Sequence, residues 1–144
     1  MYAALNDLLI NVGRSLLQYV GECWPWADAN TQDEQQAIDR LVQRQKQQVG
    51  QLANLLREAE WSTDYGSYPT EYTDLHYVAL DYLLDQLIQN QRGLVEDANA
   101  TLAACEEDPE AKKLVAEIRD VQNAIADELE ALAYEVKSSR TKSV

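Results

Sequence analysis

Residues that carry metal, redox and nucleophile chemistry are scarce in this chain. Its 144 residues include one histidine and two cysteines. Cys23 and Cys105 are too few for a disulfide framework and lack the spacing of metal ligands, so we expect both to be small buried residues near helix ends. The sequence also contains no Gly-rich phosphate loop, no nucleophile elbow and no Cys–His pairing. Enzyme classes that depend on these motifs are therefore disfavoured, and we expect no cofactor.

Linkers and long apolar runs are missing as well. The five glycines and three prolines are spread singly or stand at plausible breaks, so nothing divides the chain into two domains. We expect one domain over residues 1–137 and a polar, basic tail over residues 138–144. No apolar run approaches the roughly 18 residues of a membrane span, and residues 1–7 do not resemble a secretory signal. The expected location is the cytoplasm, without a membrane partner.

Positive charge is also in short supply. The chain has 12 lysines and arginines against 25 acidic residues, a formal net charge of −13. Between Glu58 and Glu110 the only basic residue besides the histidine is Arg92. Nucleic-acid binding needs clustered Lys and Arg to neutralise phosphates, so we expect none here. An acidic surface of this kind repels phosphates and anionic lipids, and it favours solubility or a basic partner.

Apolar residues at helical spacing, in contrast, occur almost everywhere. The predicted helices span residues 5–23, 31–60, 74–106 and 108–137. Proline in Trp24-Pro25-Trp26 ends the first helix. Thr31 and Glu34 have the spacing of a capping box at the start of the second. Asp108 is the expected N-cap of the fourth, with Pro109 in its first turn. The fold class is therefore all-α, and four long amphipathic helices predict a four-helix bundle.

The connections predict the topology of this bundle. The third and fourth helices are joined by a few residues and should be antiparallel neighbours. Residues 61–73 lack helical periodicity and could reach roughly 40 Å when extended, whereas a hairpin needs only a few residues. We therefore expect a long crossover between the second and third helices, which makes these two parallel. This topology places Cys23 and Cys105 at opposite ends.

Over nearly its whole length the chain resembles small bacterial ferritin-like proteins. The resemblance lies in the segment Leu5-Asn6-Asp7-Leu8-Leu9 and, more strongly, in the helix lengths, the crossover and the short third-to-fourth turn. It implies a di-metal carboxylate centre at mid-height, with a Glu from each of two helices and a Glu-x-x-His from each of the other two. The corresponding positions in this sequence are Leu16, Gln45, Gln48, Gln91, Val121 and Ala124.

None of these positions holds a carboxylate or an imidazole. The second helix places Gln45 and Gln48 inward at the spacing of Glu-x-x-His, and the third helix places Gln91 on its apolar stripe. Neutral amides cannot supply the charge that holds two iron ions. We expect the buried amides to hydrogen bond with one another, with Tyr19 or with a trapped water, although Gln48 could also reach solvent at the edge of its stripe.

Other residues leave alternatives open. Glu71, Asp74 and His76 could form a displaced metal site, as could Glu128 and Glu135, although a lone histidine on an apolar face is usually structural. Trp24, Trp26 and Trp61 stand at helix ends, where they could plug the core or bind a partner. Leu75, Val78 and Tyr82 give the third helix a second apolar face, which the tyrosine-rich crossover or a second subunit could cover.

The leading hypothesis is a non-catalytic ferritin-like bundle that lacks the di-metal centre and has a structural or protein-interaction role, as a homodimer or with another protein. One alternative is a di-metal oxidoreductase or metal-storage protein with a displaced site. Another is a small-molecule binder that uses a polar cavity at mid-height.

Overall fold

A computed structural model describes residues 1–24 and 31–142, and no strand occurs in these two ranges. Its elements are α1 (Tyr2–Gly13), α2 (Leu16–Glu22), α3 (Gln32–Glu58), the 3-10 helix η2 (Thr70–Tyr77), α4 (Leu80–Ala104) and α5 (Pro109–Lys142). The predicted all-α class is confirmed. No helix of the described ranges is long and apolar enough to cross a membrane.

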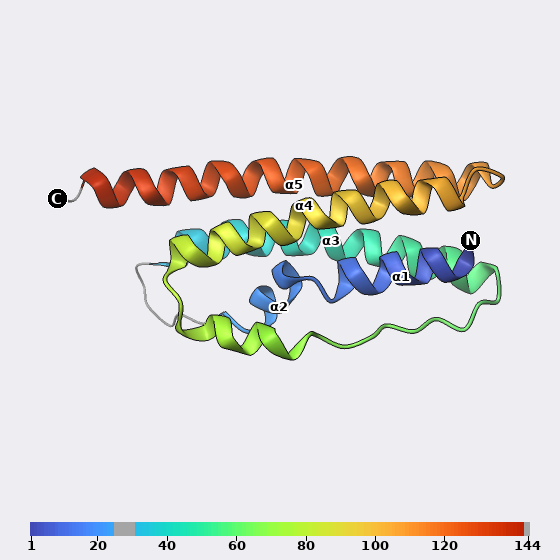
Figure 1. The fold of residues 1–144 in the computed structure, drawn as a ribbon, viewed down its shortest axis with the longest axis horizontal. Coiled ribbons are helices and arrows are strands. Elements are labelled where there is room, and N and C mark those ends of the chain that lie inside the picture. Colours follow the sequence, from blue (N-terminus) through green and yellow to red (C-terminus); the bar gives the residue numbers. More distant parts are fainter. Residues whose placement is uncertain (25–30, 143–144) are drawn as a thin grey trace.

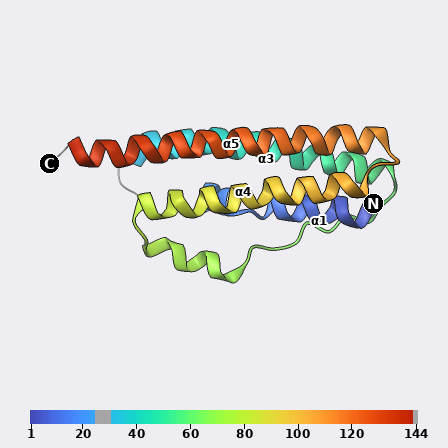
Figure 2. The same ribbon diagram turned by 45° about the horizontal axis from the view of Figure 1, so that its top comes forward.

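The long helices lie side by side (Figures 1 and 2). α3 and α4 both run from the end near the C-terminus toward the end that holds the N-terminus, and α5 returns antiparallel to α4. Between α3 and α4 the chain runs back along the whole assembly as an extended segment followed by η2 (Figure 1). The structure therefore has the long crossover expected from residues 61–73. Cys105, the C-cap of α4, packs in one apolar cluster of the core, whereas Val20 and Trp24, on either side of the α2 C-cap Cys23, pack in the other, so the two cysteines belong to opposite halves of the assembly.

Side-chain caps begin two of the described helices, and Asp108 is one of them. Asp108 Oδ1 accepts hydrogen bonds from the backbone N–H groups of Glu110 and Ala111, both at 3.1 Å, so it caps α5 as predicted. Thr31 is the N-cap residue of α3, but its side chain makes no capping bond, and the expected capping box is wrong. Its hydroxyl instead accepts the Trp24 indole N–H at 3.4 Å.

The end of α3 is a Schellman motif. The Trp61 N–H bonds the Leu56 carbonyl and the Glu60 N–H bonds the Arg57 carbonyl, both at 2.9 Å. Glu60 takes a φ of 58° to allow this. A left-handed conformation is usual for glycine at this position and costs a glutamate about 1 kcal/mol. The chain thus leaves α3 abruptly and enters the crossover.

Three predicted helices have other bounds in the structure. The first helix is interrupted between Gly13 and Leu16, because the Ser15 side chain accepts the Gln18 N–H and so starts a new helix. Asn90 Oδ1 satisfies the freed N–H of Leu16 at 3.1 Å. The third helix begins at Leu80 rather than at residue 74, since residues 70–77 form η2. At the other end, α5 continues to Lys142, so helix replaces most of the tail expected from residue 138.

The crossover is fastened to α1 and α2. Asn6 binds the backbone of Asp64 twice, donating to its carbonyl at 2.9 Å and accepting from its N–H at 3.0 Å. Arg14 Nε donates to the Tyr65 carbonyl at 3.2 Å. The Tyr19 ring packs edge-on against Tyr68, with ring centroids 5.3 Å apart. Asn6, Arg14 and Tyr19 therefore hold the crossover against α1 and α2.

The apolar core consists of two separate clusters. One contains Leu5, Leu8, Leu9, Val12, Leu52, Leu56, Leu94, Ala98, Cys105, Ala111, Val115 and Ile118. The other contains Leu16, Leu17, Val20, Ile38, Leu41, Val42, Leu83, Leu84, Leu87, Ile125, Leu129 and Ala133. Cys105 is buried as expected, but Cys23 is exposed, which corrects the prediction that both thiols are buried. In every long helix the two clusters leave a short gap at mid-length.

Candidate functional site

Polar side chains fill the gap between the two apolar clusters. Five glutamines and one serine from α3, α4, α5 and the α1–α2 segment lie there, nearly inaccessible to solvent. Their exposed fractions are 2% for Ser15, 3% for Gln18, 0% for Gln45, 6% for Gln48, 1% for Gln91 and 0% for Gln122. We call these six residues the amide layer. Gln45, Gln48 and Gln91 thus lie inward, as the sequence predicts, and Gln48 does not reach solvent freely.

Gln45 stands at the centre of the layer. Its Oε1 accepts hydrogen bonds from Ser15 Oγ at 3.2 Å and from Gln18 Nε2 at 3.0 Å. Its Nε2 donates to Gln91 Oε1 and to Gln122 Oε1, both at 2.9 Å. One α3 side chain therefore links all the other helices that contribute to the layer.

Gln122 completes the network from α5. Its Oε1 also accepts from Gln91 Nε2 at 2.6 Å, and its Nε2 donates to Gln48 Oε1. Gln91 Nε2 additionally reaches the Gln122 backbone carbonyl at 3.1 Å. Among the buried side-chain polar atoms of the described residues, only Glu34 Oε2 lacks a partner, so no buried amide atom of the layer is left unsatisfied.

The chemistry of this layer is that of neutral amides. Its groups are five amides and the Ser15 hydroxyl, none of which is charged or titrates near neutral pH, and the layer has no base that could activate the hydroxyl. A di-iron centre needs carboxylates and imidazoles to balance the metal charge, and the residues at this level do not fit it. Among the side chains that the structure describes, which do not include that of His76, no three His, Cys, Asp or Glu residues are grouped so that they could hold a metal ion.

Sequence reasoning identified only part of the layer. It selected Val121 and Ala124 on the fourth helix, but these two side chains are half-buried, and the residue that enters the layer is Gln122. Leu16 lies in an apolar cluster, whereas its neighbours Ser15 and Gln18 contribute the polar groups. Gln122 stands four residues after Ile118 and three before Ile125, and this spacing was the signal that could have found it.

The proposed displaced metal site is not assembled by the described side chains. Glu71 and Asp74 are exposed on η2. His76 belongs to η2 rather than to a long helix, and its side chain lies outside the described residues. Glu128 is paired with Arg44 on α3, and Glu135 lines a cleft described below.

Residues expected at an interaction surface have mixed environments. Trp24 is half-buried against an apolar cluster, and Leu75 and Val78 pack against the same cluster. Trp61 is 39% exposed and contacts the Tyr2 ring, with centroids 5.8 Å apart. Tyr82 is 50% exposed. Trp26 lies outside the described residues.

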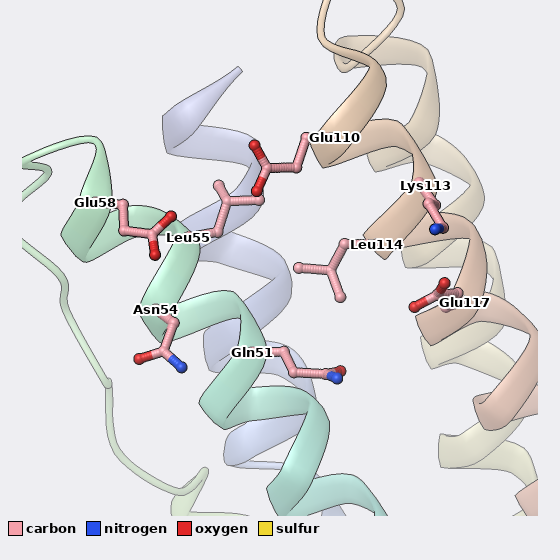
Figure 3. Close-up of a pocket in the computed structure, with 8 residues that line it drawn as sticks. All are labelled: Gln51, Asn54, Leu55, Glu58, Glu110, Lys113, Leu114 and Glu117. Atoms are coloured by element: carbon pink, nitrogen blue, oxygen red, sulfur yellow. The ribbon is translucent and has the colours of Figure 1, made fainter.

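Surface clefts follow the seam between α3 and α5. One, of about 300 Å³, is lined by Gln51, Asn54, Leu55, Glu58, Glu110, Lys113, Leu114 and Glu117. Figure 3 shows Leu55 and Leu114 between the two helices, with the acidic side chains around them. Farther along the seam, a second cleft of about 380 Å³ is lined by Ala37, Arg40, Leu41, Arg44, Glu128 and Leu132. A third adjoins it and adds Asp33, Glu34, Glu135, Val136 and Ser139.

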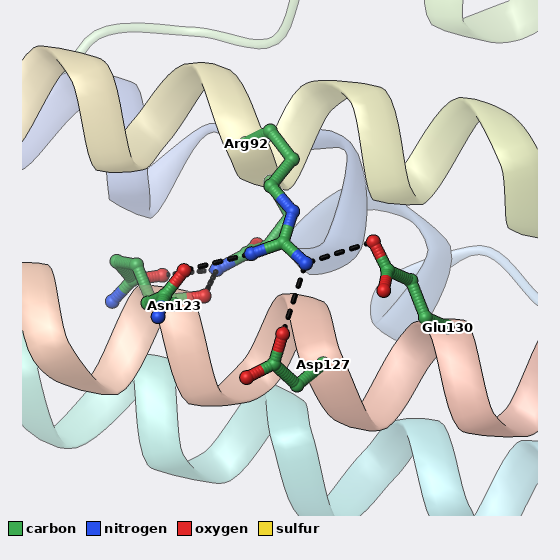
Figure 4. A network of polar contacts seen from close by, with 6 residues as sticks. Arg92, Asn123, Asp127 and Glu130 are labelled. Carbon is green, nitrogen blue, oxygen red and sulfur yellow. Dashed lines mark hydrogen bonds and ion pairs between the residues drawn. The ribbon is translucent and has the colours of Figure 1, made fainter.

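Between α4 and α5, Arg92 connects the two helices through polar contacts (Figure 4). From α4, its guanidinium donates to Asn123 at 2.7 Å, to Asp127 at 2.9 Å and to Glu130 at 2.8 Å. Hydrogen bonds to Glu130 and then Asp127 raise the pKa of Arg92. These side chains are between 38% and 64% exposed, so the pairs stabilise the fold by less than about 1 kcal/mol each. Arg92, the only basic residue besides the histidine between Glu58 and Glu110, is therefore already paired with acidic side chains of α5.

Comparison of the chain with protein-family models, with curated proteins and with solved structures finds no significant match. Its function is therefore inferred from the chemistry of the site.

Proposed function

We propose that the protein is a non-catalytic helical bundle of the ferritin-like class, and that it acts as a structural or protein-interaction module. In this proposal the amide layer occupies the level at which a di-metal centre would lie, and it holds the helices together without metal. The function then depends on the outer surface, through a second copy of the chain or another protein.

The observation that carries the proposal is the self-satisfied amide layer. Gln45 and Gln48 are three residues apart on α3, the spacing of a Glu-x-x-His pair, and both bond to amides from other helices. A neutral network of this kind has no net charge with which to attract cations. Each fully buried side-chain polar atom of the layer has a hydrogen-bond partner within the chain, so the layer presents no unsatisfied buried group to a small molecule. The described clefts are lined by surface residues and not by the amide layer.

Helix direction supports the same class. α3 and α4 run parallel and are linked by a connection that spans the assembly, while α4 and α5 form a tight antiparallel pair (Figure 1). Ferritin-like folds use one long crossover of this type, whereas simple up-and-down bundles use short loops throughout.

The test is elemental analysis of protein purified without chelator or affinity tag, combined with thermal unfolding before and after exhaustive chelation. We expect less than about 0.1 metal ion per chain and the same unfolding temperature in both samples, because metal removal should not affect a fold held by amides. Iron, manganese or zinc at one or more ions per chain, with a lower unfolding temperature after chelation, would overturn the proposal and direct attention to Glu71, Asp74 and His76.

A further inference from the structure

The seam between α3 and α5 combines an apolar floor with a rim of net negative charge. Acidic side chains outnumber basic ones in the cleft at Leu55 and Leu114 and in the cleft that Asp33, Glu34 and Glu135 line, whereas the cleft at Leu41 and Leu132 has Arg40 and Arg44 beside Glu128. Leu55 and Leu114 form the floor of one cleft, and Leu41 and Leu132 form the floor of the next. Except for Leu41, which is buried, these leucines remain partly accessible. The two clefts lie on the same pair of helices, so a single elongated ligand could occupy both.

Charge around the seam selects the partner. Seven acidic and three basic side chains line the three clefts. One of the bases, Arg44, is already paired with Glu128. At the cleft of Figure 3, Glu58, Glu110 and Glu117 surround the leucines and only Lys113 opposes them. A second copy of this acidic chain would meet like charge there, whereas a basic ligand would be attracted.

The spacing of the floor indicates the shape of that ligand. Leu41 and Leu55 are about 14 residues apart on α3, which corresponds to roughly 21 Å along the helix axis. A helix laid along the seam would need apolar side chains on one face at both ends of such a span, with Lys or Arg on its flanks. This is the helix-in-groove mode of peptide recognition.

We propose that the α3–α5 seam binds a basic amphipathic helix of another protein. Its apolar face contacts Leu55, Leu114, Leu41 and Leu132, and its basic flanks pair with the acidic rim. This inference builds on the proposed function, since it names the partner class of an interaction module.

The test uses the full chain and a fluorescent peptide of about 20 residues, built from Leu and Lys with Leu at helical i, i+3, i+4 spacing. A peptide with the same composition in scrambled order keeps the charge but lacks the apolar stripe. We expect fluorescence anisotropy to show saturable binding of the first peptide, and binding of the scrambled peptide at least tenfold weaker, because burial of several leucines is lost.

Two variants locate the binding site. Leu114→Ser should weaken binding about tenfold, since it removes one apolar contact of the groove, whereas Tyr134→Ser, which deletes a 74% exposed side chain of α5 away from the clefts, should leave it unchanged. Glu110→Gln/Glu117→Gln should weaken binding several-fold at low salt. The matched control Glu71→Gln/Glu96→Gln removes the same charge outside the seam and should change binding less than twofold.

Three results of the peptide experiments would overturn the inference. They are equal binding of the scrambled peptide, equal weakening by both charge pairs, and no saturable binding at about 100 µM chain. Sedimentation that shows a dimer dissociated by Leu114→Ser would also overturn it, because a second copy would then occupy the seam. If the protein is metal-free but does not bind the peptide, the inference about the seam is wrong and the proposed function stands. If its stability depends on metal but it binds the peptide, the proposed function is wrong and the inference about the seam stands.

Discussion

Replacing Gln45 by leucine tests whether the amide layer is a real hydrogen-bond network. The substitution removes four hydrogen bonds and leaves Gln91 Oε1 and the Ser15 hydroxyl without the partners they have now. Each orphaned buried group costs about 1–3 kcal/mol. The extra apolar surface of leucine offsets about 1–2 kcal/mol of this. We therefore expect Gln45→Leu to lower the free energy of unfolding by about 2–3 kcal/mol.

A double-mutant cycle makes this expectation specific. Gln91→Leu removes the acceptor that Gln45→Leu would orphan, so the double variant should be more stable than the sum of the two losses by about 1–2 kcal/mol. Urea unfolding followed by far-UV circular dichroism measures all four proteins. Gln47→Leu is the matched control: Gln47 is exposed on the same turn of α3, and its replacement should change stability by less than about 0.5 kcal/mol. Strict additivity, or a Gln45→Leu variant as stable as the parent, would refute the network.

Three further substitutions test other features of the fold. In Gly21→Ala, the new Cβ would lie 2.7 Å from Val42 Cγ2, so thermal unfolding should show a loss of about 1–3 kcal/mol that Val42→Ala partly restores. Glu60→Gly should increase the free energy of unfolding by about 1 kcal/mol and so raise the urea midpoint, because glycine adopts the φ of 58° found at this position without strain. Burial, and then Glu96, raise the pKa of the Asp97 carboxyl, which disfavours its charged form in the folded state. Asp97→Asn should therefore stabilise the protein at pH 7, and this gain should vanish once acid protonates Asp97 in both folded and unfolded chains.

Helix spacing and connection length predicted the all-α class and the relative directions of α3, α4 and α5. Apolar periodicity identified α3, α4 and α5, and the length of residues 61–73 favoured a crossover over a hairpin. The break between α1 and α2 was missed because the apolar stripe continues through it. The competing local preference comes from Ser15, whose capping bond to Gln18 starts a second helix, and from Asn90, a distant residue that accepts the Leu16 N–H. The hydrogen bond between the Leu16 N–H and Asn90, a residue of α4, has no signal in the sequence around Leu16.

The start of the third helix was misjudged for a related reason. Residues 74–79 have apolar side chains at helical spacing, but residues 74–77 belong to η2, and Val78 and Ala79 have extended backbone. Leu75 and Val78 pack against the same apolar cluster as the helix would have done. The hydrophobic pattern therefore predicts which side chains are buried better than it predicts the secondary structure of the backbone that carries them.

The amide layer was half predicted. Inward glutamines on the second and third helices stood out because each interrupts a stripe of leucines. Gln122 also interrupts an apolar stripe, between Ile118 and Ile125, but the resemblance to a metal site implies the neighbouring positions Val121 and Ala124 instead. Gln18 could not be placed without the break at Ser15, which shifts the inward face of α2. The partners of a buried amide are set by helix rotation, and periodicity determines rotation only to within one residue.

The amide layer also defines how the helices align along their axes. Gln45, Gln91 and Gln122 belong to three helices and meet at one level. Sliding one helix by a turn, about 5.4 Å, would bury its glutamine among leucines and leave other amides unpaired, at about 1–3 kcal/mol for each orphaned group. Leucines alone would permit such a slip at little cost, since uniform apolar cores pack in several ways. We infer that a neutral polar layer preserves a single alignment, and with it the position of α3 relative to α5, on which the shape of the seam depends.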